Sequence, residues 1–248
     1  MLPTIATGNV GSALAGEYEV ANSLRFNDDS SDTLTLSEVD PQGNRKTVTL
    51  SVWVKRCALG SEQAIYSHYY NTSYYNHLRF GSNDQIEYYD ILNGTYNISL
   101  ETNRKFRDTS AWYHIVVRVD TTQSTEADRV RLYINGVQET SFATMNYPSQ
   151  DATLNLDGGA GYTNFIGQRG GNVMYFDGYM AEFFKIQGTS YAPTEFGEFD
   201  SDSPTIWKPK EADVTFGSKG VFLDFENSSN LGADVSGNGN NFTVNNLT

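Results

Sequence analysis

The sequence predicts an all-β protein, a two-sheet antiparallel sandwich, and three observations support this fold class. Apolar residues recur at every second position in several stretches, as in strands with one buried face. The 16 Tyr and 14 Phe residues greatly outnumber the 4 Met residues, which favours strands over helices. The 22 Gly residues suit a fold with many turns. Sandwiches of this length can form one domain, so we expect one sandwich over residues 23–248 after a small-residue arm at residues 1–22.

The first strands are predicted between residues 24 and 55. Leu24 and Phe26 alternate with polar residues, a polar turn covers residues 27–32, and Leu34 and Leu36 alternate again. After a second turn, residues 48–55 place four apolar side chains on one face, and Thr49, Ser51, Trp53 and Lys55 on the other. This stretch is the clearest buried strand in the sequence.

The stretch from residue 63 to residue 109 is less regular and rich in Tyr and Asn. Short strands are predicted at residues 64–67, 77–80, 85–89 and 97–101. Between the first two lies a candidate ligand-binding set: Tyr69, Tyr70, Tyr74, Tyr75, Asn76 and His77. Aromatic rings stack on the C–H faces of sugars and Asn side chains orient hydroxyl groups, so the set suggests a carbohydrate surface. The alternative is that these tyrosines fill an edge sheet and pack against their neighbours.

The stretch from residue 111 to residue 142 is the one around which the rest is arranged. Alternation predicts strands at residues 113–119 and 130–134, joined by a polar connection at residues 121–128. Asn135 and Gly136 supply the two positive-φ positions of a type I′ hairpin turn. Residues 137–142 are therefore predicted to return as a paired strand.

The last third of the chain begins with a Gly-rich loop at residues 155–172, which lacks the pattern of a phosphate loop. A strand is predicted at residues 177–186, and one helical turn at residues 191–197, with Thr194 as its N-cap. Residues 221–225 read as another apolar strand. We expect residues 241–247 to form the final strand beside Leu24 and Phe26, closing the sandwich and covering that apolar strand.

Composition narrows the classes of partner. The net charge of −13 and the pI near 4.5 argue against a nucleic-acid partner, which needs a basic footprint. They suit a soluble particle or a surface that holds cations. Cys57 is the single cysteine, so no intrachain disulfide forms. No run of about 18 apolar residues and no secretory signal is visible, so we expect no membrane insertion.

The segment from Glu198 to Asp202 is the one candidate for catalysis. Glu198, Asp200 and Asp202 would share one face of a strand, which resembles the E-x-D-x-E catalytic strand of family 16 glycanases. Retaining hydrolysis needs two carboxyl groups about 5 Å apart. The third position is Asp rather than Glu, however, and the flanking Gly197 and Pro204 indicate a loop. No Ser/His/Asp arrangement is legible around the histidines either, so we expect no catalytic residues and no enzyme.

A second constellation lies near the end of the chain. Asp234, Ser236 and Asn238 place oxygen donors at alternate positions before a Gly turn, as a Ca²⁺ loop requires. Position twelve of such a loop would be Asn245 rather than Glu. The alternative is a tight Asx-turn without metal.

Several motifs together resemble the laminin-G-like, concanavalin A-like jelly-roll superfamily. They are W-Y-H-x-x-V…R-x-x-L-Y-x-N-G from Trp112, T-x-S-x-W-V-K-R from Thr49, F-I-G-Q from Phe165 and D-x-S-G-N-G-N from Asp234. The resemblance implies a jelly-roll sandwich of the concanavalin A-like lectin/glucanase fold, which carries lectins, glycanases, adhesins and structural modules. In that superfamily D-x-S-G-N-G-N usually stands near the start. Its position here has two explanations: the strand order is circularly permuted, which we favour, or the chain is the first unit of a longer architecture.

From Ser23 to Thr248 the chain also resembles virion proteins of marine tailed bacteriophages, through collinear motifs such as WYHIVVRVDTTQ, DGYMAE and SGNGN. These are structural, tail-fibre or head-appendage proteins with a concanavalin A-like domain. The resemblance implies a non-enzymatic protein of the virion surface, assembled in the host cytoplasm, which adheres to host-surface glycan or decorates the particle. Its implied partners are other virion proteins of the head or tail, with residues 1–22 as a particle anchor. Proteins of this kind are often homotrimers.

An alternative function of another class is a glycan hydrolase of the family 16 type, acting on host or environmental polysaccharide. The fold admits both functions, and the residues from Glu198 to Asp202 are those that would carry the second.

Overall fold

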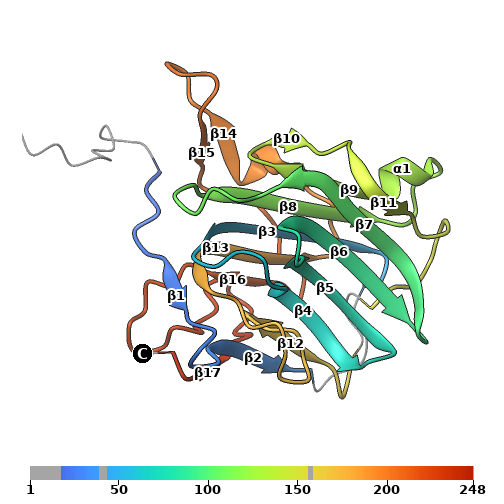
Figure 1. The fold of residues 1–248 in the computed structure, drawn as a ribbon, viewed down its shortest axis with the longest axis horizontal. Coiled ribbons are helices and arrows are strands. Elements are labelled where there is room, and N and C mark those ends of the chain that lie inside the picture. Colours follow the sequence, from blue (N-terminus) through green and yellow to red (C-terminus); the bar gives the residue numbers. More distant parts are fainter. Residues whose placement is uncertain (1–17, 39–43, 156–158, 248) are drawn as a thin grey trace, which may run out of the picture.

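The computed structural model describes residues 18–38, 44–155 and 159–247, and strands dominate these ranges. The strands form two large antiparallel sheets that pack face to face, and a small hairpin stands apart from both (Figure 1). The predicted all-β, two-sheet sandwich is therefore confirmed.

The first sheet, called here the seven-stranded sheet, has the order β1-β13-β3-β8-β9-β10, with β16 also paired to β13. Its strands are β1 (Leu24–Phe26), β3 (Thr47–Arg56), β8 (Tyr113–Asp120), β9 (Val130–Ile134), β10 (Val137–Gln138), β13 (Gly178–Gln187) and β16 (Val221–Leu223). The predicted alternating strands β3, β8 and β9 are neighbours in this sheet.

The second sheet, the eight-stranded sheet, has the order β11-β7-β6-β5-β4-β12-β2-β17. Its strands are β2 (Thr33–Ser37), β4 (Gln63–Asn71), β5 (Tyr74–Phe80), β6 (Gln85–Leu92), β7 (Thr95–Lys105), β11 (Phe142–Asn146), β12 (Thr163–Ile166) and β17 (Thr243–Asn245). The elements outside the two sheets are the hairpin strands β14 (Gly197–Phe199) and β15 (Trp207–Pro209), helix α1 (Glu126–Arg129) and the 3-10 turn η1 (Pro193–Glu195).

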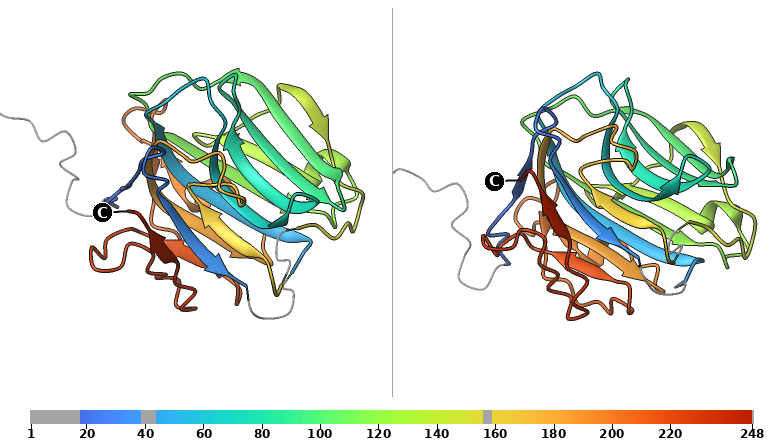
Figure 2. Two further views of the ribbon diagram at one scale, coloured as in Figure 1. Left: turned by 60° about the horizontal axis from the view of Figure 1, so that its bottom comes forward. Right: turned by 90° about the horizontal axis from the view of Figure 1, so that it is seen from below.

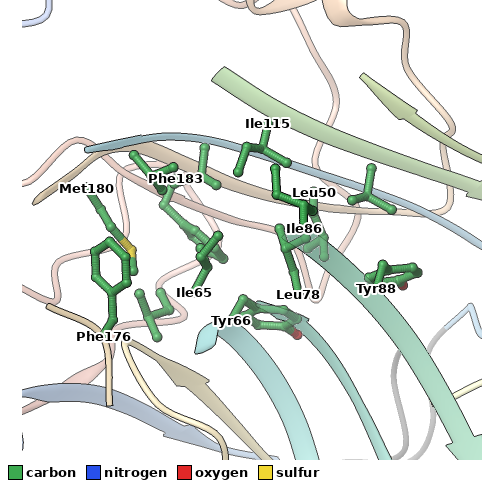
Figure 3. Packing of buried hydrophobic residues seen from close by; sticks show 14 of the residues in the cluster. Leu50, Ile65, Tyr66, Leu78, Ile86, Tyr88, Ile115, Phe176, Met180 and Phe183 are labelled. Atoms are coloured by element: carbon green, nitrogen blue, oxygen red, sulfur yellow. The ribbon is translucent and has the colours of Figure 1, made fainter. Parts of the chain in front are cut away.

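The hydrophobic core lies between the two sheets. Leu50 and Ile115 enter it from the seven-stranded sheet, and Leu78 and Tyr88 enter it from the eight-stranded sheet (Figure 3). Each of these side chains is at most 2% exposed. The two-residue period of the strands thus sends alternate side chains into one shared interior and leaves the others on the outer faces.

The β9–β10 hairpin forms around the predicted Asn-Gly turn, with φ of 50° at Asn135 and 77° at Gly136. The predicted returning strand at residues 137–142 is wrong in its length. Only Val137 and Gln138 pair with β9, and the chain then crosses to the other sheet, where β11 pairs with β7. The connection predicted at residues 121–128 also contains part of helix α1.

The sandwich is closed by its last strand, but not beside the predicted partner. β17 pairs with β2 rather than with β1, so it extends the eight-stranded sheet (Figure 2). β16 is covered as expected, since it pairs with β13. The predicted helical turn is present as η1, but its N-cap is Ala192, not Thr194, and Ala192 makes no side-chain cap.

Residues 1–17 of the predicted arm lie outside the described residues. Its last part, from Tyr18 to Asn22, runs along the outer face of the seven-stranded sheet, where the Tyr18 hydroxyl donates a hydrogen bond of 2.8 Å to Glu182. In the part of the chain that the structure describes, no helix has the length and apolar character needed to cross a membrane.

Candidate ligand-binding face

The outer face of the eight-stranded sheet carries a band of aromatic side chains. Strand register aligns Tyr69 of β4 with Tyr75 of β5, and His77 of β5 with Tyr89 of β6. Arg169, in the loop after β12, lies over the rings of Tyr69 and Tyr75. We call these five residues the tyrosine face.

The rings of the tyrosine face contact one another in sequence. Ring centroids are 6.0 Å apart for Tyr69 and Tyr75, 5.3 Å for Tyr75 and His77, and 5.2 Å for His77 and Tyr89. Tyr96 extends the row, with its ring 5.4 Å from that of Tyr89. Such contacts fix the ring orientations. Tyr75 and Tyr89 are 9% and 7% exposed, whereas Tyr96 is 53% exposed.

His77 forms the floor of the face. It is 1% exposed, and neither of its ring nitrogens has a hydrogen-bond partner. Burial lowers the pKa of His77 well below its ordinary value, and the nearby cations Arg79 and Arg169 lower it further. His77 is therefore neutral, with one nitrogen able to donate and the other able to accept a hydrogen bond. Buried polar atoms without partners are uncommon and indicate a missing water or ligand.

The charges beside His77 are partly neutralised. Arg79 Nε lies 2.6 Å from Glu87, and its Nη1 lies 2.8 Å from Glu62. The Tyr89 hydroxyl donates to Glu101 on β7. In contrast, the structure gives Arg169 no carboxylate partner among the described residues.

The loop that carries Arg169 is held against the sheet. A Cβ atom at Gly170 would lie 2.2 Å from Cδ1 of Tyr69, so only glycine lets the backbone approach this ring. The backbone of Arg169 bridges to Val173, and the Gly170 amide donates to Ser67 Oγ at 3.4 Å. The packing and hydrogen bonds of the loop backbone thus hold Arg169 beside the tyrosines.

The structure divides the six residues predicted as a ligand site. Tyr69, Tyr75 and His77 lie together on the tyrosine face, whereas the other three have the opposite orientation. Asn76 is 1% exposed and lies opposite His68 on one neighbouring strand and opposite Asp90 on the other. Tyr70 and Tyr74 lie at the end of the sandwich, where Tyr70 stacks on Tyr162 with 5.2 Å between centroids.

Two members of the face are not predicted from the sequence. The sequence pattern puts Tyr89 in a strand but not in the site, and Arg169 only in a Gly-rich loop. Strand alternation could have suggested that neighbours such as Tyr69 and Tyr70 point apart. Nothing local in the sequence brings Arg169 to the tyrosines, because their contact depends on how β12 pairs with β4.

The predicted Ca²⁺ loop forms a tight turn around Asp234. Its Oδ1 accepts the Phe222 and Ser236 amides at 3.0 and 2.9 Å, and its Oδ2 accepts the Ser236 hydroxyl and the Asn240 amide. The Asn238 side chain donates to carbonyl groups of residues 217 and 220. This pattern is that of an Asx-turn. Ca²⁺ binding would have to replace several of these hydrogen bonds, and it stays a prediction. Within the described ranges, no group of three or more His, Cys, Asp or Glu residues is arranged to hold a metal ion.

The carboxylates that resemble a glycanase strand lie on the β14–β15 hairpin, which projects from the sandwich (Figure 1). Lys208 lies 3.6 Å from Glu198 and 3.5 Å from Asp200. Asp200 also accepts the amides of Asp202 and Ser203, and these hydrogen bonds lower its pKa. A glycosidase acid needs the opposite shift, because it must hold a proton near neutral pH.

A buried Ser–His pair lies on the other sheet. Trp207 Nε1 donates to His114 Nδ1 at 2.9 Å, so the proton of the neutral ring is on Nε2, which donates to Ser51 Oγ at 2.8 Å. Burial lowers the pKa of His114 to about 3. A general base would need an unprotonated nitrogen facing the hydroxyl. His114 instead links Trp207 of the hairpin to Ser51 of the sheet.

Comparison with known proteins gives a family and several similar folds. The sequence profile of the "Concanavalin A-like lectin/glucanases superfamily" (Laminin_G_3) matches residues 28–186. No curated protein sequence matches the chain. Among solved structures, the native heptameric SAP-like pentraxin of Limulus polyphemus is 15% identical, with a TM-score of 0.50 over 71% of this chain and 80% of the pentraxin.

Two further structures are similar at lower TM-scores. Domains LG4-5 of the mouse laminin alpha1 chain are 13% identical, with a TM-score of 0.48 over 72% of this chain and 45% of that one. Tailspike protein 2 of Escherichia coli O157:H7 bacteriophage CAB120 is also 13% identical, with a TM-score of 0.49 over 71% of this chain and 23% of the tailspike. At these identities the likeness concerns the fold alone.

Proposed function

Since this chain belongs to the concanavalin A-like lectin/glucanase superfamily, we propose that it is a non-enzymatic glycan-binding protein of a bacteriophage virion surface. The tyrosine face is its sugar-contacting surface. The observation that carries the proposal is the neutral His77, buried between Tyr75 and Tyr89 with both ring nitrogens unpartnered. Aromatic faces for sugar C–H groups beside a donor and an acceptor for hydroxyl groups are the features that bind a saccharide.

The place on a phage particle is supported by the collinear sequence motifs between Ser23 and Thr248. As a tail fibre, head fibre or capsid decoration, the protein would display this face to host-surface glycan while other virion proteins hold it. Homotrimeric assembly belongs to the same proposal. The position of the chain in a cryo-EM map of the intact particle tests its place on the particle, its contacts with other virion proteins and its trimeric assembly.

Glycan binding is tested on an array of host-surface polysaccharides with the Tyr69→Ala variant. We expect the wild-type protein to bind and the variant to lose about two- to twelvefold in affinity, because one ring contact contributes roughly 0.5–1.5 kcal/mol. Tyr70→Ala is the matched control, since Tyr70 is adjacent in sequence but points away from the face and is 53% exposed. Equal losses in the two variants, or no binding at all, contradict the proposal. Repeating the array with EDTA tests the predicted Ca²⁺ requirement.

The hydrolase alternative is separated by an assay for reducing ends released from the same polysaccharides. We expect no release by the wild-type protein. Release that disappears in Glu198→Gln would assign catalysis to the hairpin and overturn the non-enzymatic proposal.

A further inference from the structure

Arg169 is the charge on the tyrosine face that the protein itself does not neutralise. Among the described residues no carboxylate lies within salt-bridge distance of it, whereas Arg79 on the same face is held by Glu87 and Glu62. The Nε atom of Arg169 is buried and has no hydrogen-bond partner. A buried guanidinium donor left in this state is costly, unless a group from outside the chain completes it.

The guanidinium lies beside the two rings to which the proposed function assigns sugar contact. Its Cζ is 5.3 Å from the ring centroid of Tyr75 and 6.0 Å from that of Tyr69, both within cation–π range. Tyr75 in turn contacts the unpartnered His77. The cation, two aromatic rings and a neutral donor–acceptor group are thus gathered on one surface.

The position of Arg169 is fixed before any ligand arrives. Gly170 packs on Tyr69 with no room for a Cβ atom, and the Arg169 backbone bridges to Val173 across a short turn. Gln168 closes this turn by donating to Asn172 at 3.2 Å. Preorganisation of this kind reduces the entropy lost on binding.

We infer that the ligand of the tyrosine face is a saccharide that carries a carboxylate, such as a uronic acid, and that Arg169 binds this carboxylate. The inference rests on the proposed glycan-binding function. A guanidinium matches a carboxylate with two parallel N–H···O bonds, which a neutral hydroxyl group cannot reproduce. The chain as a whole has a net charge of −13, so it does not attract acidic glycans at a distance. Arg169 must therefore select the ligand at contact, within the Debye length of about 8 Å in physiological salt.

The test is an array of uronic-acid oligosaccharides, from alginate, hyaluronan and bacterial capsules, printed beside the same oligosaccharides after carboxyl reduction. Reduction converts each carboxylate to a primary alcohol and keeps the ring stereochemistry. We expect binding to acidic members only, and a loss of about tenfold or more in Arg169→Gln, since the charge-assisted hydrogen bonds to the carboxylate are lost. Arg169→Lys keeps the positive charge but not the two parallel N–H donors, so its affinity should lie between those of the wild type and Arg169→Gln.

Arg118→Gln on the seven-stranded sheet is the matched control, because it removes one positive charge far from the face and should bind like wild type. Circular dichroism of each variant verifies the fold. Equal binding of native and reduced oligosaccharides, or unchanged affinity in Arg169→Gln, overturns the inference but leaves the glycan-binding proposal intact. Binding to no saccharide of either array overturns both.

Discussion

Burial in the sandwich changes the protonation of the Asp90 carboxyl group. It is fully buried, and its Oδ2 accepts the amide of Asn155 at 2.7 Å, while its Oδ1 accepts a weaker hydrogen bond of 3.3 Å from Asn97. Burial raises the pKa of Asp90 to about 7, although these hydrogen bonds oppose the shift. The folded protein therefore keeps a proton on Asp90 at pH values where the unfolded chain has lost it.

This shift predicts a pH dependence that Asp90→Asn should remove. The folded pKa lies above the unfolded value, so the contribution of Asp90 to stability is complete below pH 4 and is lost as the pH rises towards 7. Asparagine cannot titrate and keeps an acceptor for Asn155. Relative to wild type, the variant should gain stability between pH 4 and pH 7, by on the order of a few kcal/mol.

Urea unfolding of both proteins at several pH values between 4 and 8 measures the difference. The histidines and Glu182 titrate in both proteins, so their effects cancel in the comparison. Parallel stability curves for the two proteins would show that Asp90 is not protonated in the folded state.

At the scale of elements, the side chain of Trp207 attaches the β14–β15 hairpin to the sandwich. Trp207 is 8% exposed, stacks on His114 with 6.0 Å between centroids, and donates to its Nδ1. A Cβ atom at Gly136 or Gly197 would meet the Trp207 ring at 2.3 and 2.7 Å, so both glycines make room for it. The carboxylates of the hairpin are thereby held away from the tyrosine face.

Trp207→Ala should release the hairpin and lower the free energy of unfolding by about 3 kcal/mol, as for other buried aromatic truncations. Trp207→Phe keeps a ring but leaves His114 Nδ1 without its donor, which should cost about 1–3 kcal/mol. Phe199→Ala is the control in the same hairpin, because Phe199 is 44% exposed and should change stability by less than about 1 kcal/mol. Urea unfolding gives these values, and amide exchange locates the release. Equal effects of Trp207→Ala and Phe199→Ala would contradict this attachment.

At the scale of the whole molecule, the last strand of the described chain completes the eight-stranded sheet. β17 pairs with β2, and the adjacent Phe242 and Leu247 enter the main core at 3% and 9% exposure. The backbone of β17 therefore covers the edge of β2, and the side chains on either side of it cover part of the core between the sheets.

Phe242→Ala should destabilise the protein by about 3–5 kcal/mol, whereas Val235→Ala in the same C-terminal segment should change stability by about 0.5 kcal/mol or less, since Val235 is 47% exposed. Deletion from Asn241 onward should additionally uncover the β2 edge and promote association, measured by light scattering after size-exclusion chromatography. A deletion variant that stays as stable and as monodisperse as the full chain would contradict closure by β17.

Local patterns were enough to predict the strands and the fold class, because the two-residue period and the Asn-Gly turn are properties of short segments of the chain. They also located the aromatic stretch around Tyr69 and Tyr75. These patterns did not predict that β17 pairs with β2, or that only two residues pair with β9 after the Asn-Gly turn. Nor did they predict which tyrosine of each adjacent pair faces outward. Register and irregular positions such as the shift between Ala64 and Tyr66 decide these points.

The candidate site depends on the tertiary structure in the same way. Arg169 is about a hundred positions from Tyr69 in the sequence, and the two meet because β12 pairs with β4 and Gly170 allows close contact. The neutral state of His77 comes from burial and from two arginines on different elements. Local side-chain patterns set which segments become strands, whereas long-range pairing sets which side chains share a face, and the proposed binding chemistry depends on this pairing.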